Sequence, residues 1–354
     1  MLTIFNVGQG DAFLLQPCCG CHFKEPGPLL LVDTGPRSAR LFRRLPTSSI
    51  VALLTHSHKD HLGGLPDLIA RKKLAGIIMP YYMPEVMAIY EYVQEYMTVR
   101  YGQPDWGKTS PLVQRLVKEG DRLCGHIEIL NPPVSPSDIF SGYGAPSEPG
   151  SIDAALNMMD NLGVDLPRDE IEEYETPLTG EGMPVEYRTS ARTFVHQFFI
   201  SLSHRVAQYG GGNLSFDINR HFQLAANQVS IVFACTHPSG ERWLFTGDAD
   251  DWVFDRLIAS GKNLSAKYLK VPHHGSRENL SIATLKAVSP EVAIVSHKNR
   301  RFGRSLDPHP HHEVMDILDR QGVRTYYTNP VIKKKVTIKP GAIGSKEGGA
   351  LNFV

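Results

Sequence analysis

The sequence predicts an α/β protein in which one functional site lies at the edge of a sheet. Short apolar runs of strand length alternate with segments of helical periodicity, both early and late in the 354-residue chain. Several of these runs are followed within three residues by an Asp, His or Ser side chain. They are Leu29–Val32, Ser49–Leu54, Arg242–Phe245, Ala266–Val271 and Glu291–Val295. Because ligand sites gather where strand ends and their loops converge, these ends predict a common site.

Helices are expected between some of these strands, because the segments that follow the strand ends carry apolar residues at helical spacing. The first expected helix begins after the Gly63-Gly64 pair, and a later one follows Asp248. The expected helices are Leu65–Lys73, Asp250–Ala259, Asn279–Val288 and Pro310–Gln321. Strands and helices that alternate in this way favour layers of helix on sheet.

The middle of the chain has a different composition. Residues 132–190 are rich in Pro, Gly, Ser, Asp and Glu, which is typical of a long and partly irregular segment. We therefore expect a single domain over residues 1–354, with a partly irregular insertion at 85–224. The insertion is interpreted as a lid over the site, a passive surface segment or the surface for a protein partner.

Overall charge gives no reason to expect a nucleic-acid or membrane partner, because 37 Lys and Arg balance 37 Asp and Glu. No apolar run approaches the ~20 residues of a membrane-spanning helix. The first ten residues lack the charged region and cleavage site of a signal peptide. Five cysteines, an odd number, then favour reduced thiols and a cytoplasmic location without membrane association.

Two local patterns leave alternatives open. The run CCGCH at Cys18–His22 lacks a second ligand pair at zinc-finger spacing, so we favour a hairpin loop over a metal site. Basic clusters at Arg37–Arg44 and Arg71–Lys73 are interpreted as solvated surface. The basic run Lys298–Arg304 is interpreted in the same way, with phosphate contact as its alternative because it follows a predicted site strand.

The segment THSHKDHLGG, Thr55–Gly64, carries the main chemistry. His56, His58, Asp60 and His61 place four metal-ligand side chains within six residues. Imidazole and carboxylate groups suit zinc, and also manganese or iron. Histidines two residues apart can aim at one ion from an extended or turning backbone, while the following Asp and His reach a second position. The segment therefore predicts a metal site.

This HxHxDH segment after an apolar strand resembles the signature of the metallo-β-lactamase superfamily. Further stretches occur in the order expected for the hydrolase domain of ComEC-type DNA-uptake proteins and their free-standing relatives. They are VGQGDAFLL at Val7–Leu15, LVDTG at Leu31–Gly35, LFTGDAD at Leu244–Asp250, LKVPHHGS at Leu269–Ser276 and DPHPHHEVMDIL at Asp307–Leu318. The resemblance covers residues 1–80 and 225–330, and it implies an αββα sandwich of two mixed sheets flanked by helices.

The resemblance also implies a set of ligands for two divalent cations, with Zn²⁺ preferred to Mn²⁺. His56 and His58 would bind the first cation, and Asp60 and His61 the second. Asp248 would bridge both cations, because a carboxylate has two oxygen atoms.

The motif leaves the remaining ligand open, because either of two adjacent imidazoles can point inward. We favour His273 as the ligand that completes the second position, with His274 as the alternative. Asp33 is expected to orient a histidine ligand through its free N–H group.

Two features depart from the wider superfamily pattern. Many members place another histidine ligand between the HxHxDH motif and the bridging Asp. His196, His204 and His221 lie in contexts unlike that motif. Asn227–Ser230 instead fits a polar Asn-x-x-Ser stretch of the ComEC-type pattern. The membrane segments of the uptake proteins are also absent from this sequence, so we do not expect it to be a DNA transporter.

The chemistry expected of such a centre is hydrolysis by a metal-bridged hydroxide, because two cations lower the pKa of a shared water towards 7. Asp60 is expected to accept the proton of the water. A further group should stabilise the leaving group or its phosphate. We favour His309 and His274 for this role, and the other candidates are Lys270, His297 and Arg301.

The predicted function is that of a phosphodiesterase or nuclease acting on nucleic acid or a nucleotide-like ester. Hydrolysis of a lactam, lactone or thioester is the first alternative, and a non-catalytic binding module is the second. The fold alone does not decide between them, because one fold supports many substrates.

Overall fold

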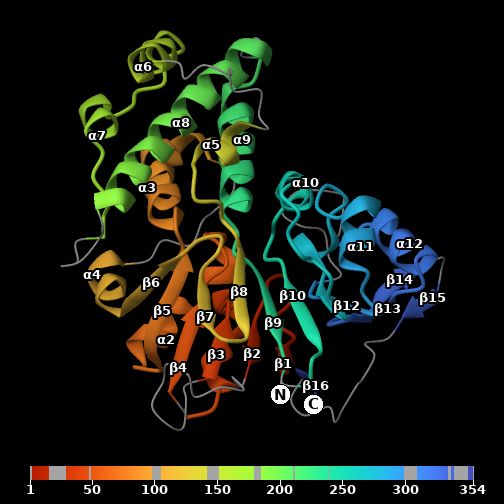
Figure 1. Ribbon diagram of the computed structural model, residues 1–354. Coiled ribbons are helices and arrows are strands. Elements are labelled where there is room, and N and C mark those ends of the chain that lie inside the picture. Colours follow the sequence, from red (N-terminus) through yellow and green to blue (C-terminus); the bar gives the residue numbers. More distant parts are fainter. Residues whose placement is uncertain are drawn as a thin grey trace.

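Two mixed β-sheets form the centre of the molecule in the computed structural model (Figure 1). The structure describes residues 2–15, 29–47, 49–97, 105–141, 151–178, 185–209, 212–237, 239–298, 309–333, 336–338 and 350–353. The predicted hairpin at Cys18–His22 and residues 299–304 of the predicted basic run lie outside these ranges.

Each sheet has seven strands in the described part of the chain. The first sheet has the order β16 (Ala350–Phe353), β1 (Leu2–Phe5), β2 (Phe13–Leu15), β3 (Leu29–Val32), β4 (Ile50–Leu53), β5 (Leu74–Pro80) and β6 (Val113–Val117). The second has the order β13 (Arg324–Tyr327), β12 (Val292–Val295), β11 (Tyr268–Lys270), β10 (Arg242–Phe245), β9 (Val232–Thr236), β8 (Ile127–Asn131) and β7 (Arg122–Cys124). A small separate hairpin pairs β14 (Val331–Lys333) with β15 (Val336–Ile338).

The two sheets repeat one pairing pattern. In the first, β16, β1, β2 and β3 pair antiparallel, and β3, β4, β5 and β6 pair parallel. In the second, β7, β8, β9 and β10 pair antiparallel, and β10, β11, β12 and β13 pair parallel. The parallel strands of both sheets are those whose carboxyl ends carry the predicted site residues.

The sheets pack face to face through one apolar cluster that draws Phe13, Val51 and Leu53 from the first sheet and Phe233 and Phe245 from the second. Alternate residues of β4 face the opposite side, where Ile50 and Ala52 join a separate cluster. A strand buried on both faces needs a continuous apolar run, which is why Ser49–Leu54 has no polar alternation.

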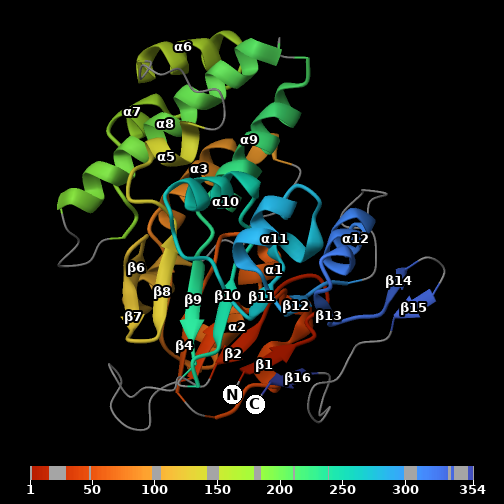
Figure 2. The same cartoon turned by 45° about the vertical axis from the view of Figure 1, so that its right-hand side comes forward.

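Helices cover the outer faces of the sandwich. Helix α2 (Leu65–Ala70) packs on the first sheet through Leu65 and Leu68. On the second sheet lie α10 (Asp251–Ala259), α11 (Ile282–Val288) and α12 (His312–Arg320), as both views show (Figures 1 and 2). The predicted αββα sandwich is confirmed by this architecture.

A helical segment stands at one end of the sandwich in both views (Figures 1 and 2). Its helices share a core of their own, rich in Phe and Tyr side chains. They are α3 (Met83–Val93), α5 (Ser137–Phe140), α6 (Ile152–Asn161), α7 (Arg168–Glu172), α8 (Val185–Tyr209) and α9 (Leu214–Gln228). Strands β6, β7 and β8 also fall within the predicted insertion at 85–224, yet they belong to the two main sheets. The domain boundaries stay a prediction.

None of the helices in the described ranges combines the length and the apolar character that a membrane crossing requires.

A buried carboxyl group ties three parts of the helical segment together. Glu85 of α3 is fully buried, and the hydroxyl of Tyr187 lies 3.0 and 2.9 Å from its two oxygens. The hydroxyl of Tyr174 lies 3.4 Å from the first of these oxygens. Burial raises the pKa of Glu85 to about 7, although the tyrosine hydroxyls act in the opposite direction.

This pKa makes the stability of the helical segment dependent on pH. The folded pKa of Glu85 lies above the unfolded value of 4.5, so the folded state is favoured when the group is protonated. Stability is therefore expected to fall as pH rises from about 4.5 to about 7. We expect Glu85→Gln to raise the free energy of unfolding at pH 8 by about 2–4 kcal/mol. Urea unfolding of both proteins at pH 5 and pH 8 measures this, and an equal pH dependence in the two would contradict it.

Candidate metal centre

The predicted ligands lie where the parallel strands of the two sheets end. The first sheet contributes Asp33, directly after β3, and the HxHxDH segment, which follows β4. From the second sheet come Asp248, after β10, and the His273-His274 pair, after β11. Side chains that are far apart in sequence thus meet between the edges of the two sheets.

Within the HxHxDH segment, the first two histidines converge. Nε2 of His56 lies 3.0 Å from Nδ1 of His58, and the two rings stand nearly perpendicular. His58 precedes the short helix α1 (Lys59–Leu62), which carries Asp60 and His61. Gly63 and Gly64 then pack against the backbone after β3, where a Cβ on Gly64 would come within 2.5 Å of the carbonyl oxygen of Thr34. This close approach explains the glycine pair.

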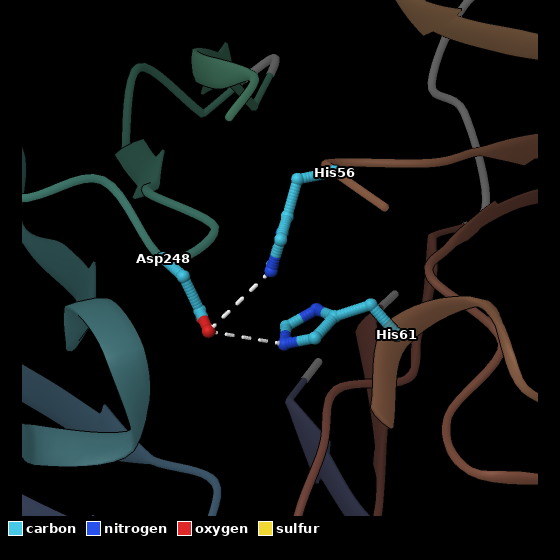
Figure 3. Close-up of side chains that lie close together, drawn as sticks. All are labelled: His56, His61 and Asp248. Atoms are coloured by element: carbon cyan, nitrogen blue, oxygen red, sulfur yellow. Dashed lines mark ion pairs between the residues drawn. The ribbon is translucent and has the colours of Figure 1, made fainter. Parts of the chain in front are cut away.

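The Oδ2 atom of Asp248 is the point on which the imidazoles converge (Figure 3). It lies 3.5 Å from Nε2 of His56 and 3.4 Å from Nε2 of His61. Nε2 of His273 and Nε2 of His274 lie 3.7 and 3.8 Å from the same oxygen. His56, His61 and Asp248 form one group of potential ligands with all donor atoms within 4.8 Å of one another.

A second group of potential ligands consists of Asp60, His61 and His274. Nε2 of His274 lies 3.4 Å from Oδ2 of Asp60, and the side chain is fully buried. The side chain of His273 keeps a fifth of its surface exposed, and Nδ1 of this residue lies 3.0 Å from Oδ1 of Asn279. Consecutive left-handed residues (φ 43° and 54°) turn His274 into the second group, although His273 lies equally near Asp248. The choice of ligand between the two histidines stays a prediction.

Asp33 lies where a residue that orients a ligand is expected. Its Oδ2 is 2.7 Å from Nδ1 of His61 and accepts a hydrogen bond from the Thr55 hydroxyl at 2.7 Å. The backbone N–H of Thr55 donates to Oδ1 at 2.7 Å. With Nδ1 turned to this carboxylate, His61 presents Nε2 to Asp248.

Two further charged side chains join the site: Asp11, which the sequence did not single out, and Lys270, which was one candidate for stabilising the leaving group. Asp11 lies just before β2, and Lys270 is the last residue of β11. They form a buried ion pair, and the ammonium also donates to the carbonyl oxygen of Gly247 at 2.7 Å. The polar residue that ends VGQGD could have pointed to Asp11. Lys270, only 2 % exposed, is too enclosed to neutralise a leaving group.

The donor atoms present fit divalent cations. Among the described residues, Nε2 of His61, Nε2 of His274 and Oδ1 of Asp248 are buried without a hydrogen-bond partner. Donors held about 2.0–2.2 Å from one tetrahedral zinc ion lie about 3.3–3.6 Å apart, which brackets the separations of His56 and His61 from Asp248. Imidazole nitrogens and carboxylate oxygens are also the donor types that zinc and manganese accept.

The electrostatics of the protein groups also favour positive charge here. Burial opposes protonation of His61, but the charges of Asp248 and Asp33 raise its pKa well above the ordinary value. Burial likewise opposes protonation of His274, whose pKa is raised by Asp248 and Asp60. Carboxylates that draw protons onto neighbouring imidazoles attract divalent cations into the same space.

The remaining described candidates for stabilising the leaving group lie at different distances from the ligands. The ring of His309 lies 5.3 Å from that of His273, and burial and the neighbouring histidines lower its pKa to about 2. A neutral His309 can still donate one N–H hydrogen bond at the rim of the site. His297 is turned away, because its Nε2 lies 2.9 Å from the carbonyl oxygen of Asn329. Arg301 lies outside the described residues.

Comparison with protein families agrees with this geometry. Residues 6–145 match the model of the metallo-beta-lactamase superfamily. The match covers less than half of the chain, and over these residues the chain is similar to a metallo-β-lactamase superfamily domain. Members of this superfamily are generally hydrolases and typically bind divalent metals. The matched residues include Asp33 and the HxHxDH segment but not Asp248, so the predicted ligands of the second sheet lie outside the match.

Individual relatives match different parts of the chain. ComE operon protein 3 of Bacillus subtilis (strain 168) is 32 % identical over 106 residues, which span 30 % of this chain and 13 % of that protein. An archaeal metallo-beta-lactamase superfamily protein from Sulfolobus tokodaii is 15 % identical, covering 36 % of this chain and 54 % of its own, with a TM-score of 0.26. A long form RNase Z from yeast is 9 % identical, covering 86 % and 38 %, with a TM-score of 0.35.

The two adjacent histidines give a matched test of the ligand set. We expect His274→Ala to lose about one equivalent of divalent metal, because it removes a buried donor that faces Asp60. His273→Ala is expected to retain the wild-type metal content. Both substitutions place Ala at a positive φ, so backbone strain is the same in the two variants. Elemental analysis after dialysis measures the content, and a greater loss in His273→Ala would reverse the assignment.

Proposed function

We propose that this protein hydrolyses phosphodiester bonds in nucleic acid or a nucleotide-like substrate, at a centre of two divalent cations. The observation that carries the proposal is the convergence of buried imidazole nitrogens on one oxygen of Asp248, with a second ligand group at Asp60 beside it. Paired cation positions on one bridging carboxylate suit the displacement of an oxygen leaving group from phosphorus.

The residues would divide between two positions. His56 and His58 would hold one cation, Asp60, His61 and His274 the other, and Asp248 would contact both. When bound, the cations would supply a water nucleophile at neutral pH and Lewis acidity towards the phosphate. Asp60, whose side chain is 18 % exposed, would accept the proton of the water. His309 would donate its N–H to the phosphate or to the leaving oxygen.

A surface next to the site supports a nucleic-acid substrate. Between residues 34 and 73 the chain has eight Lys or Arg but only two Asp and no Glu, although its overall charge is zero. The structure brings the two clusters interpreted as solvated surface together around Phe42. The ring of Phe42 lies 3.9 Å from the guanidinium of Arg71 and 5.7 Å from that of Arg43. We call this surface the basic strip: Arg37, Arg40, Arg43, Arg44, Arg71, Lys72 and Lys73.

The basic strip begins beside the proposed ligands. The backbone of Arg37 packs against Gly63, directly after the helix that carries Asp60 and His61. Arg44 donates to the carbonyl oxygen of Asn6 at 2.8 Å, on the loop that leads to Asp11. A polyanion that crossed the strip would therefore reach the site, whereas a lactam, lactone or thioester would gain nothing from it.

Two alternative functions would use the same cation site in different ways. Hydrolysis of a lactam, lactone or thioester would use the same cations on a carbonyl carbon, and a non-catalytic binding module would hold cations without turnover. The helical segment is proposed as the surface for any protein partner. A cytoplasmic location stays a prediction.

The activity test uses bis-p-nitrophenyl phosphate and labelled single- and double-stranded DNA, with Mn²⁺ or Zn²⁺ added after chelation. We expect cation-dependent cleavage that falls at least ~100-fold in His58→Ala and in Asp248→Ala, since each removes a cation ligand. Circular dichroism checks that both variants remain folded. Full turnover in either folded variant would contradict the ligand assignment. Cation binding with turnover of a lactam, lactone or thioester instead of a phosphodiester would favour the first alternative.

A charge-reversal variant tests the basic strip. Arg40→Glu/Arg43→Glu/Lys72→Glu changes three exposed side chains. We expect it to bind DNA about tenfold or more weakly near 0.1 M salt, because each reversed side chain removes a phosphate contact. Each lost contact should also lower the slope of log affinity against log salt concentration by about one. Fluorescence anisotropy of labelled DNA over a series of salt concentrations measures both quantities.

The matched control carries the same charge change on the outer face of the second sheet. Lys286→Glu/Arg320→Glu/Arg324→Glu also reverses three exposed cations. This control is expected to bind DNA like the wild type, apart from a small general effect of net charge. Equal losses in the two variants would mean that the basic strip is not the binding surface.

A further inference from the structure

Lys270 is a buried cation in direct contact with the proposed metal centre but not with substrate. Its side chain is 2 % exposed. The ammonium group donates to the carbonyl oxygen of Gly247 at 2.7 Å and pairs with Oδ2 of Asp11. It also lies 3.7 Å from Oδ1 of Asp248. The ammonium is thus within hydrogen-bond distance of two oxygen atoms, whereas Oδ1 of Asp248 lies beyond that distance and interacts with it through charge.

The two oxygen atoms of Asp248 consequently have different surroundings. Oδ2 faces the imidazoles of His56 and His61 at 3.5 and 3.4 Å, whereas Oδ1 faces Lys270. Oδ1 has no hydrogen-bond partner among the described residues, so the ammonium is the charge that attracts it. A carboxylate without this attraction can rotate and present either oxygen, or both, to a cation.

Lys270 also offsets part of the negative charge of the site. Asp11, Asp33, Asp60 and Asp248 place four carboxylates around the ligands. Among the described residues, Lys270 is the one Lys or Arg that pairs with any of them. Asp11 reaches further, because its oxygens lie 3.7 Å from Nδ1 of His274 and 3.9 Å from Nδ1 of His61. The Asp11–Lys270 pair therefore borders both histidines of the second ligand group.

We propose that Lys270 is a positioning residue of the metal centre, which holds Oδ1 of Asp248 and presents Oδ2 to both cation positions. The proposal rests on the cation centre proposed above, but not on the identity of the substrate. Through this contact, β11 fixes the orientation of a ligand on the neighbouring strand end after β10.

The test compares two variants whose cation affinities should differ in opposite directions, depending on whether the net charge of the site or the orientation of Asp248 decides the affinity. Asp11→Asn removes one negative charge and keeps Lys270. The double variant Asp11→Asn/Lys270→Met also removes the ammonium, which restores the net charge of the wild-type site. If charge alone mattered, the double variant would bind cations more tightly than Asp11→Asn. If Lys270 positions Asp248, the double variant binds more weakly, by about tenfold or more.

Cation affinity is measured by competition with a chromophoric chelator, and the visible spectrum of the Co²⁺-loaded protein reports the ligand geometry. We expect the double variant to show the weaker affinity and an altered Co²⁺ spectrum relative to Asp11→Asn. Tighter or equal binding with an unchanged spectrum would overturn the proposal, as would a wild-type protein that binds no divalent cation. Cation binding by a wild type that cleaves no phosphodiester would reject the proposed function and leave this comparison valid.

A remote ion pair provides the matched control. Lys262 lies 2.7 Å from Glu119, and Lys262→Met/Glu119→Gln removes a lysine and a carboxylate without changing net charge. Its cation affinity and Co²⁺ spectrum should equal those of the wild type. If the double variant does not fold, Lys270→Arg replaces it. This variant keeps the positive charge but places it at a different distance from Asp248. An unchanged Co²⁺ spectrum in Lys270→Arg would also contradict the positioning role.

Discussion

The burial of Asp248 between two sheets is the constraint on which the rest of the site depends. A carboxylate that is 1 % exposed is stable only when cationic or hydrogen-bonding groups surround it. The chain meets this need with histidines from both sheets and with one lysine. Asp33, His273 and His274 accept positive φ angles to reach their places, and such angles cost roughly 1–2 kcal/mol each for residues other than glycine. Strain of this kind persists only where the surroundings hold it, as they do here.

The fold was predictable because its central strands are buried on both faces. Runs such as Leu29–Val32 must then be wholly apolar, and the polar residue that ends each run marks a sheet edge. The orientation of the His273 and His274 side chains was not predictable, because it depends on consecutive left-handed residues that no periodicity reveals. Asp11 was missed for a similar reason, since it enters the site only once β2 pairs with β3.

The helical segment shows what composition leaves open. Its Pro and Gly content predicted a partly irregular segment, and its described residues also include helices that share an aromatic core. Helix α9 connects this core to the site. Arg220 pairs with Glu278 at 2.7 Å, just after the His273-His274 turn, and Gln228 donates to Asp250, two residues beyond Asp248. The segment is therefore joined to the second sheet at the loops that carry its ligands. Sequence patterns do not reveal these contacts, because the contacting residues are far apart in the sequence.

The division of ligands between two sheets has a consequence for the order in which the centre is made. His61 and Asp248 are roughly 190 residues apart, so during synthesis the HxHxDH segment leaves the ribosome well before its partners. An incomplete chain already presents imidazoles, but it lacks Asp248 and the buried lysine. The candidate ligand set exists only after the second sheet has docked. Any selection among metals would therefore be a property of the completed molecule rather than of its early folding stages.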